Sequence, residues 1–350
     1  LSILAERMTP SALELRLIAG LIYSRQGEYK KASQQALASL LAADELQQPS
    51  IVARAHNLLG TIDRLRGRLD GAAEHFQEAF ALYKELGNLQ GQALAQNSLA
   101  NAYFDLGQWS EADRYYRNSG QIFIQLGNIY NRVLVDNNLG GIALNQGRLD
   151  DALLFYQRAL RALEQIGGSL WVMGALNLNL GATHIRRAEM TTAFAHLARS
   201  RELFEQAKVR DLLPEMHRRL AEAHLVQGST IQARDEAQQS LAIAQELTML
   251  AEQGLTLRTM GAIAIAESAL DEARVHLDQS ITLLGQVGDN YGLACAQLTL
   301  AELHAAEGDS ARRDAMLSQC IPVFTGLGAS LELERAQNLL QSSLPTKAAV

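Results

Sequence analysis

Six asparagines recur in phase along the chain, with a chemistry suited to holding a polypeptide backbone. They are Asn57, Asn97, Asn101, Asn137, Asn138 and Asn179. An amide side chain both donates and accepts hydrogen bonds, so a row of amides can bind the main chain of an extended peptide whatever its sequence. Asparagine is also a mediocre helix former, so its recurrence inside helices calls for a reason. The alternative is that these amides bridge neighbouring helices or face water.

Five arginines lie in or beside the same phase and indicate carboxylate recognition. They are Arg54, Arg64, Arg186, Arg218 and Arg219. A guanidinium group binds a carboxylate through two parallel hydrogen bonds, so the arginines predict a partner with acidic side chains. The alternative is neutralisation by Glu215, Glu222 and Glu302, which share the face, because faces of mixed charge are common on exposed helices.

Four large apolar residues occupy one further repeating position. They are Phe104, Leu144, Ile185 and Leu225. Pockets of this kind hold the anchor side chains of a bound partner. The same residues could equally form the core between repeats, and the pattern does not decide between the two.

The sequence contains no motif for catalysis. Dinucleotide, Walker-type and Gly-x-Ser-x-Gly motifs are all missing. Three of the eight histidines, His184, His224 and His304, take a repeat position held elsewhere by Tyr23 and Tyr103. We expect them to be packing residues with one polar edge satisfied, and we find no histidine spaced for metal binding. The expectation is a protein without catalytic activity, cofactor or metal.

A repeat of about 40 residues positions all these side chains. Its phase is set by a small residue, usually glycine, that we call the anchor. The anchors are Gly27, Gly67, Gly107, Gly147, Ala188, Gly228, Ser268 and Gly308. Seven steps of 40 or 41 residues, each ending on a small residue, indicate eight structural repeats.

Each repeat has two apolar segments around its anchor. Leu59 and Gly60, eight and seven residues before Gly67, predict a close approach of two helices, with the leucine filling the gap beside the glycine. The anchor predicts a left-handed cap after the first helix. Ala72 and Ala79, seven residues apart on the second helix, keep one face shallow for stacking.

Both ends of the array have predicted features. Residues 1–9 are expected to be the tail of a preceding helix, and 331–341 a final helix that covers repeat eight. Arg313 takes an alanine position in repeat eight, which fits a half-exposed terminal unit. Residues 342–350 are expected to fray. The chain does not begin with Met, so it is interpreted as a possible fragment of something longer.

Composition excludes several classes of protein. Apolar residues make up 48% of the chain and aromatic residues only 5%, which favours closely packed helices. A net charge of −7 argues against direct binding of nucleic acid. No apolar run is long enough for a bilayer, and no secretory signal is recognised. Two distant cysteines, Cys295 and Cys320, fit a reducing, cytoplasmic setting.

The pattern resembles the tetratricopeptide repeat (TPR) family. Repeat three carries its signature as Leu99, Ala100, Tyr103, Gly107, Ala112, Tyr116 and Ser119. The usual period of that family is about 34 residues, so this chain is similar to a longer subclass that includes LGN/Pins adaptors, kinesin light chain and the sensor regions of MalT-like regulators. The resemblance implies an all-α, right-handed solenoid of eight helix pairs plus a C-terminal capping helix, formed as one domain over 1–341. It also implies that the first helix of each pair lines a groove with the residues named above.

Two functions follow as expectations. The first is a non-catalytic scaffold that holds an extended or helical segment of a partner protein in the groove. The second is a sensor or oligomerisation module cut from a larger bacterial signalling or transcription regulator. The expected partner is a protein or peptide with acidic character, and a homo-oligomer stays open as an alternative.

Overall fold

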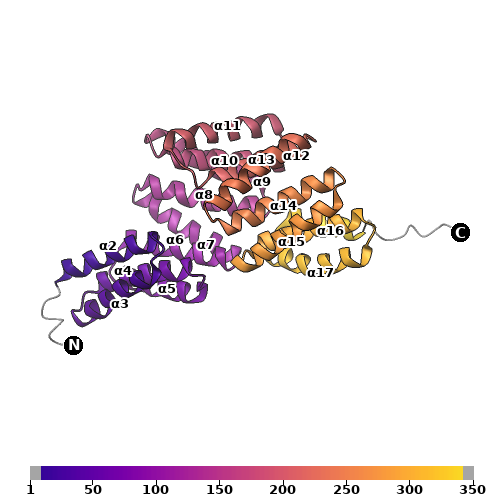
Figure 1. Ribbon diagram of the computed structural model, residues 1–350. Coiled ribbons are helices and arrows are strands. Elements are labelled where there is room, and N and C mark those ends of the chain that lie inside the picture. Colours follow the sequence, from indigo (N-terminus) through magenta and orange to yellow (C-terminus); the bar gives the residue numbers. More distant parts are fainter. Residues whose placement is uncertain (1–8, 342–350) are drawn as a thin grey trace. The chain divides into compact units, whose positions relative to one another are not determined.

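A computed structural model describes residues 9–341, and these residues are helical throughout apart from short turns (Figure 1). Seventeen helices and no strand occur within this range. Eight antiparallel helix pairs are followed by one further helix, so the predicted fold class is confirmed. The expectations for residues 1–8 and 342–350 lie outside the described residues. Thr9, assigned to a preceding helix, is instead the N-cap of the first described helix, and its side chain accepts a hydrogen bond from the Ala12 amide.

The chain divides into two compact units, residues 1–139 and 140–350. The prediction of a single array over 1–341 therefore stays a prediction, and each unit is described separately. The helices that begin in unit 1 are α2 (Pro10–Arg25), α3 (Tyr29–Glu45), α4 (Pro49–Leu65), α5 (Leu69–Glu85), α6 (Leu89–Asp105), α7 (Trp109–Gln125) and α8 (Ile129–Asn145). The last six residues of α8 belong to unit 2.

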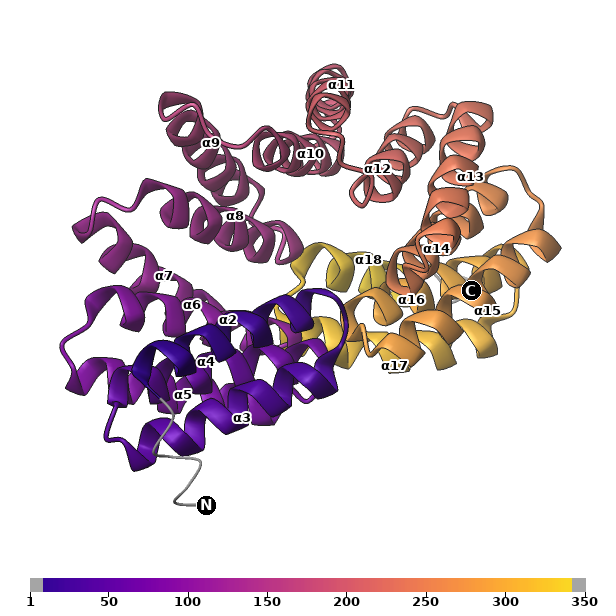
Figure 2. The same ribbon diagram turned by 60° about the vertical axis from the view of Figure 1, so that its left-hand side comes forward.

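Unit 2 continues with α9, which completes the pair begun by α8, then four further helix pairs of the repeat and the final helix α18. Its helices are α9 (Leu149–Gln165), α10 (Leu170–Arg186), α11 (Met190–Ala207), α12 (Leu213–Val226), α13 (Thr230–Glu246), α14 (Leu250–Ala266), α15 (Leu270–Val287), α16 (Asn290–Ala306), α17 (Ser310–Leu327) and α18 (Ser330–Gln341). In Figure 2, α18 lies between the C-terminal end of α8 and α16.

The anchor positions form the turns as predicted. Gly67 follows α4 with φ +73°, a left-handed conformation that glycine adopts without a steric cost. The backbone keeps this conformation even where the anchor is not glycine, at Ala188 (φ +58°) and Ser268 (φ +61°). The turn geometry is therefore a property of the repeat, and these two residues bear the strain.

Close helix approach explains the small residue seven positions before each anchor. A Cβ added to Gly60 would lie 2.7 Å from Cε1 of Phe76 on the paired helix α5. Phe76 is almost fully buried, so the ring fills the space that the glycine leaves. The alanines of the second helices, such as Ala72 and Ala79, are completely buried.

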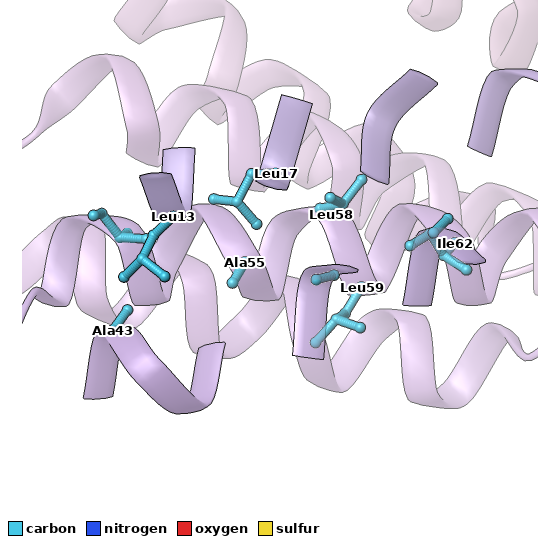
Figure 3. Close-up of a cluster of buried hydrophobic side chains, with 10 residues drawn as sticks. Leu13, Leu17, Ala43, Ala55, Leu58, Leu59 and Ile62 are labelled. Carbon is cyan, nitrogen blue, oxygen red and sulfur yellow. The ribbon is translucent and has the colours of Figure 1, made fainter. Parts of the chain in front are cut away.

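The core consists of clusters that join successive helices. In the first repeats, α2, α3 and α4 bury one such cluster (Figure 3). Leu13 and Ile62 within it are fully buried. At the base of this cluster the buried Ser39 hydroxyl donates to the Leu13 carbonyl at 3.2 Å. The small residues of the second helices thus permit both stacking and hydrogen bonding to the first helices.

The predicted final helix is present as α18, but Arg313 of repeat eight is buried rather than half-exposed. Arg313 is only 6% exposed and pairs with Asp314 at 2.8 Å. A long arginine stem can be buried in an alanine position when its charged end reaches a carboxylate. The departure from the repeat at this position is therefore accommodated by an ion pair.

Candidate functional site

The first helices of unit 1 carry the predicted amides in one phase. We call the set on α4, α6 and α8 the Asn face, and it comprises Asn57, Asn97, Asn101, Asn137 and Asn138. All five are half-buried, neither in the core nor fully in water. The sixth predicted amide, Asn179, is half-buried on α10 in unit 2.

Two members of the Asn face have an unused acceptor. The side-chain carbonyl oxygens of Asn57 and Asn97 are buried and have no hydrogen-bond partner among the described residues. These two positions are equivalent in successive repeats. A buried acceptor without a partner costs about 1–3 kcal/mol, so the free protein holds an unfavourable arrangement that a donor would relieve.

Two other members, Asn101 and Asn138, form hydrogen bonds within the protein. The Tyr116 hydroxyl on α7 donates to Oδ1 of Asn101 at 2.5 Å. The Asn138 amide on α8 donates to the same oxygen at 3.4 Å. Burial raises the pKa of Tyr116, so the hydroxyl keeps the proton that it donates. For Asn101 and Asn138 the structure supports the alternative interpretation, in which the amides bridge neighbouring helices.

The two arginines expected beside the groove in unit 1 are paired between repeats. Arg54 on α4 lies 2.7 Å from Glu14 on α2. Arg64 on α4 lies 2.8 Å from Asp105 on α6. Both pairs are partly exposed, so each contributes at most about 1 kcal/mol and could be exchanged for an acidic ligand.

The four apolar candidates separate into core and half-buried residues. Leu144 and Ile185 are 5% and 8% exposed, which favours the alternative stated above, in which they belong to the core. Ile185 belongs to a cluster of buried residues contributed by α10, α11 and α12. Phe104 is half-buried and stacks on Trp109 with ring centroids 5.9 Å apart, and Leu225 is half-buried within a core cluster.

Arg218 and Arg219 belong to an ion-pair network in unit 2. Arg218, only 2% exposed, donates from Nε to Glu252 at 2.5 Å. Glu222 accepts hydrogen bonds from Arg218 at 3.1 Å and from Arg219 at 3.0 Å. It accepts a further one from Arg258 at 3.1 Å. Arg218 therefore does not face a ligand, and neutralisation by carboxylates, the alternative stated above, holds for this cluster.

The network changes the titration of its central carboxylate. Burial alone would raise the pKa of Glu222, but Arg219, Arg218 and Arg258 lower it well below its ordinary range. Sequence reasoning missed Arg258, although it stands 40 residues after Arg218 in the same repeat position. The repeat period is the signal that would have found it.

Arg186 has partners on three elements. Its guanidinium donates to the Leu144 carbonyl at 3.2 Å and to the Tyr291 hydroxyl at 3.0 Å. It also forms an ion pair with Glu332 of α18 at 2.8 Å. Burial alone would lower the pKa of Arg186, but Tyr291 and Glu332 raise it above its ordinary value. We call Arg186, Tyr291 and Glu332 the Arg186 site.

Two of the three predicted histidines behave as packing residues with one polar edge satisfied, whereas His224 packs against Phe194 and its buried Nδ1 has no partner among the described residues. His184 is 7% exposed with its Nδ1 2.6 Å from Glu189, and His304 is 4% exposed with its Nδ1 3.2 Å from Glu307. Within residues 9–341, no three His, Cys, Asp or Glu side chains gather in a way that could hold a metal ion. No helix in the same range is both long and apolar enough to cross a bilayer.

A family comparison matches part of the N-terminal half of the chain. The model described as tetratricopeptide repeat matches residues 51–119 and 91–165. The two matches overlap and together span residues 51–165. The match covers the helices that carry the Asn face, and it confirms the resemblance on which the groove positions were assigned.

Solved structures share the tetratricopeptide-like fold over most of the chain. A Rap protein complexed with competence and sporulation factor has a TM-score of 0.65 and 11% identity, over 95% of this chain and 98% of that one. The quorum sensor NprR from B. thuringiensis, in its apo form, has a TM-score of 0.65 and 14% identity, over 91% and 90%. NprR in complex with its cognate peptide NprX has a TM-score of 0.62. At these identities the likeness is one of fold.

One curated relative matches part of the repeat array. The regulatory protein AfsR of Streptomyces griseus is 27% identical over 114 residues, which are 33% of this chain and 12% of AfsR. The matched region is thus a small part of that longer protein.

Proposed function

We propose that this protein is a non-catalytic scaffold that binds an extended or helical segment of a partner protein along the first helices of its tetratricopeptide repeats. Support comes from the fold, shared with a Rap protein and with NprR, both solved with bound signalling factors or peptides. The absence of catalytic motifs from the sequence agrees with this proposal.

The observation that carries the proposal is the pair of unused acceptors on the Asn face. Asn57 and Asn97 hold equivalent positions on α4 and α6, and both have a buried oxygen without a partner. A backbone N–H of a bound segment would supply the donor once rotation of the half-buried amide side chain has exposed the oxygen. Because almost every residue has a main-chain donor, these two amides would bind the backbone of a partner segment largely independently of its side chains. The partner's side chains would then contribute to affinity through the apolar and charged residues around Asn57 and Asn97.

The test is selection of binding peptides followed by mapping. A random peptide library is selected on the full chain, and hydrogen exchange is measured with and without the best peptide. The proposal predicts slowed exchange in α4 and α6. Binding that slows exchange only in the second helices would place the site elsewhere and refute the role of the Asn face.

The second candidate function is a sensor or oligomerisation module of a larger regulator, and the similarity to AfsR favours it. The two functions are compatible, because a sensor also binds a ligand. They differ in whether binding changes another activity of the same polypeptide. Sequencing the complete gene, and measuring the mass of the chain by light scattering with and without peptide, separates them.

A further inference from the structure

Helix α18 reaches back across unit 2 to the end of α8. The Ser330 hydroxyl donates to the Gln146 carbonyl at 2.7 Å, although 184 residues separate the two. The Gln146 side chain donates to the Leu327 carbonyl at 3.3 Å. A Cβ on Gly147 would lie 2.5 Å from Oγ of Ser330, so the two segments are in close contact. Figure 2 shows α18 in this position.

Charged residues of α18 pair with groove positions of the first helices. Glu332 pairs with Arg186 of α10 at 2.8 Å, and Arg335 pairs with Glu302 of α16 at 2.5 Å. Arg186 is five residues after the small residue of its repeat, and Glu302 is one residue after. Both are positions that the resemblance assigns to the groove. The chain's own C-terminal helix therefore covers part of the surface on which a partner is expected.

Few contacts attach α18 to the rest of unit 2. Ala336 is its only buried residue, and Leu340 is 40% exposed. A helix of 12 residues has little stability of its own. Elements with few buried apolar contacts open at a lower free energy than the core does. The ion pair of Glu332, whose side chain is 12% exposed, is the best-shielded charged contact that α18 makes.

We propose that Arg186 and Tyr291 form a binding site for a carboxylate of a partner's helical segment, and that Glu332 of α18 occupies this site until the partner displaces it. The inference rests on the proposed function and names the chemistry of the partner, an acidic amphipathic helix. The guanidinium donates to the carboxylate, and the Tyr291 hydroxyl accepts a hydrogen bond from the same guanidinium and so helps to fix its position. The Arg186 side chain is 24% exposed, and a partly buried guanidinium without its carboxylate is unfavourable, so the site favours exchange of one carboxylate for another over an empty state.

The test uses a labelled peptide with the sequence of residues 330–341 and the full chain. In the chain variant Glu332→Gln the resident helix loses its ion pair, so we expect the peptide to bind at least tenfold more tightly than to the parent. A peptide carrying Gln at the position of Glu332 should bind this variant at least tenfold more weakly. Adding Arg186→Gln to the chain should remove the difference between the two peptides.

The matched control is Glu334→Gln, because Glu334 is exposed two residues along the same helix. In the chain or in the peptide it should change affinity less than twofold. Faster hydrogen exchange of α18 in Glu332→Gln, with an unchanged circular dichroism spectrum, provides a second readout that does not depend on the peptide.

Two results would overturn the proposal. One is equal binding of the Glu and Gln peptides to the Glu332→Gln chain. The other is dimerisation of that chain without peptide, which would make a second copy the occupant. If library peptides still depend on Asn57 and Asn97 in either case, the proposed function stands and only the Arg186 site is refuted.

Discussion

A Cβ added to Gly140 would lie 2.5 Å from Cε1 of Tyr156. Tyr156 is 1% exposed on α9 and belongs to the largest fully buried side chains of the described residues. Its ring leaves no room for a side chain on α8 at this position, which explains the glycine seven residues before the anchor Gly147. The relation shows how a short sequence pattern sets the spacing of a helix pair.

This contact predicts that Gly140→Ala destabilises the protein by about 1–3 kcal/mol, because the ring must move from a packed position. Urea unfolding followed by circular dichroism measures the change. The control is Gly141→Ala, where the nearest atom of Tyr156 is 3.9 Å away. There the helix propensity of alanine should raise stability by up to about 1 kcal/mol. Equal effects of the two variants would refute the close-packing explanation.

The strained anchors predict stabilising substitutions. Ala188→Gly and Ser268→Gly should each raise the free energy of unfolding by about 1 kcal/mol, because glycine adopts their left-handed conformation without a clash. The same denaturant titration measures this. Gly67→Ala provides the reverse case and should lower stability by a similar amount. A loss of stability in both glycine variants would contradict the interpretation.

The network around Glu222 predicts a dependence of stability on pH. Its pKa is lowered in the folded state, so as the pH falls below about 4.5 the unfolded chain takes up the proton first. The stabilisation is present at neutral pH and decreases as the pH falls towards the folded pKa. Unfolding free energies measured between pH 7 and pH 3 should show this decrease, and Glu222→Gln should flatten it.

Removing the charge should also be costly at neutral pH. Glu222→Gln leaves three arginines with one carboxylate fewer, and breaking a buried pair costs about 3–5 kcal/mol. Glu202 forms a surface pair with Arg199, with side chains 59% and 54% exposed. Glu202→Gln should therefore change stability by less than about 1 kcal/mol. A cost at Glu222 no larger than at Glu202 would mean that the network does not stabilise unit 2.

Local features of the fold were predictable from the sequence, and long-range ones were not. The anchors and the small residues before them act within about 30 residues, as the contact of Gly60 with Phe76 shows. The ion pair of Arg186 with Glu332 joins residues 146 positions apart, and no periodic pattern indicates it. The pattern left Leu144 and Ile185 undecided between pocket and core, because it does not report burial, which the structure gives as 5% and 8% exposed.

The Asn face shows the same limit of prediction from the sequence. Their phase predicted that they share a face, but it did not separate Asn101, bonded to Tyr116, from Asn57 and Asn97, which have an unused oxygen. Asn101→Ala should therefore lower stability by about 1–3 kcal/mol, because it leaves the buried Tyr116 hydroxyl without its acceptor. Thermal unfolding of Asn101→Ala beside Asn97→Ala tests this difference. If Asn97→Ala is the more destabilising of the two, the assignment of structural and binding amides is reversed.

The most direct test of the central claim is calorimetric titration of a library-selected peptide into the double variant Asn57→Ala/Asn97→Ala. The control is Asn118→Ala, an exposed amide on the second helix α7. We predict that the double variant binds at least tenfold more weakly than the parent while its melting temperature does not fall, because the removed oxygens are unpaired in the free protein. Affinity equal to that of the parent and of Asn118→Ala would contradict the account.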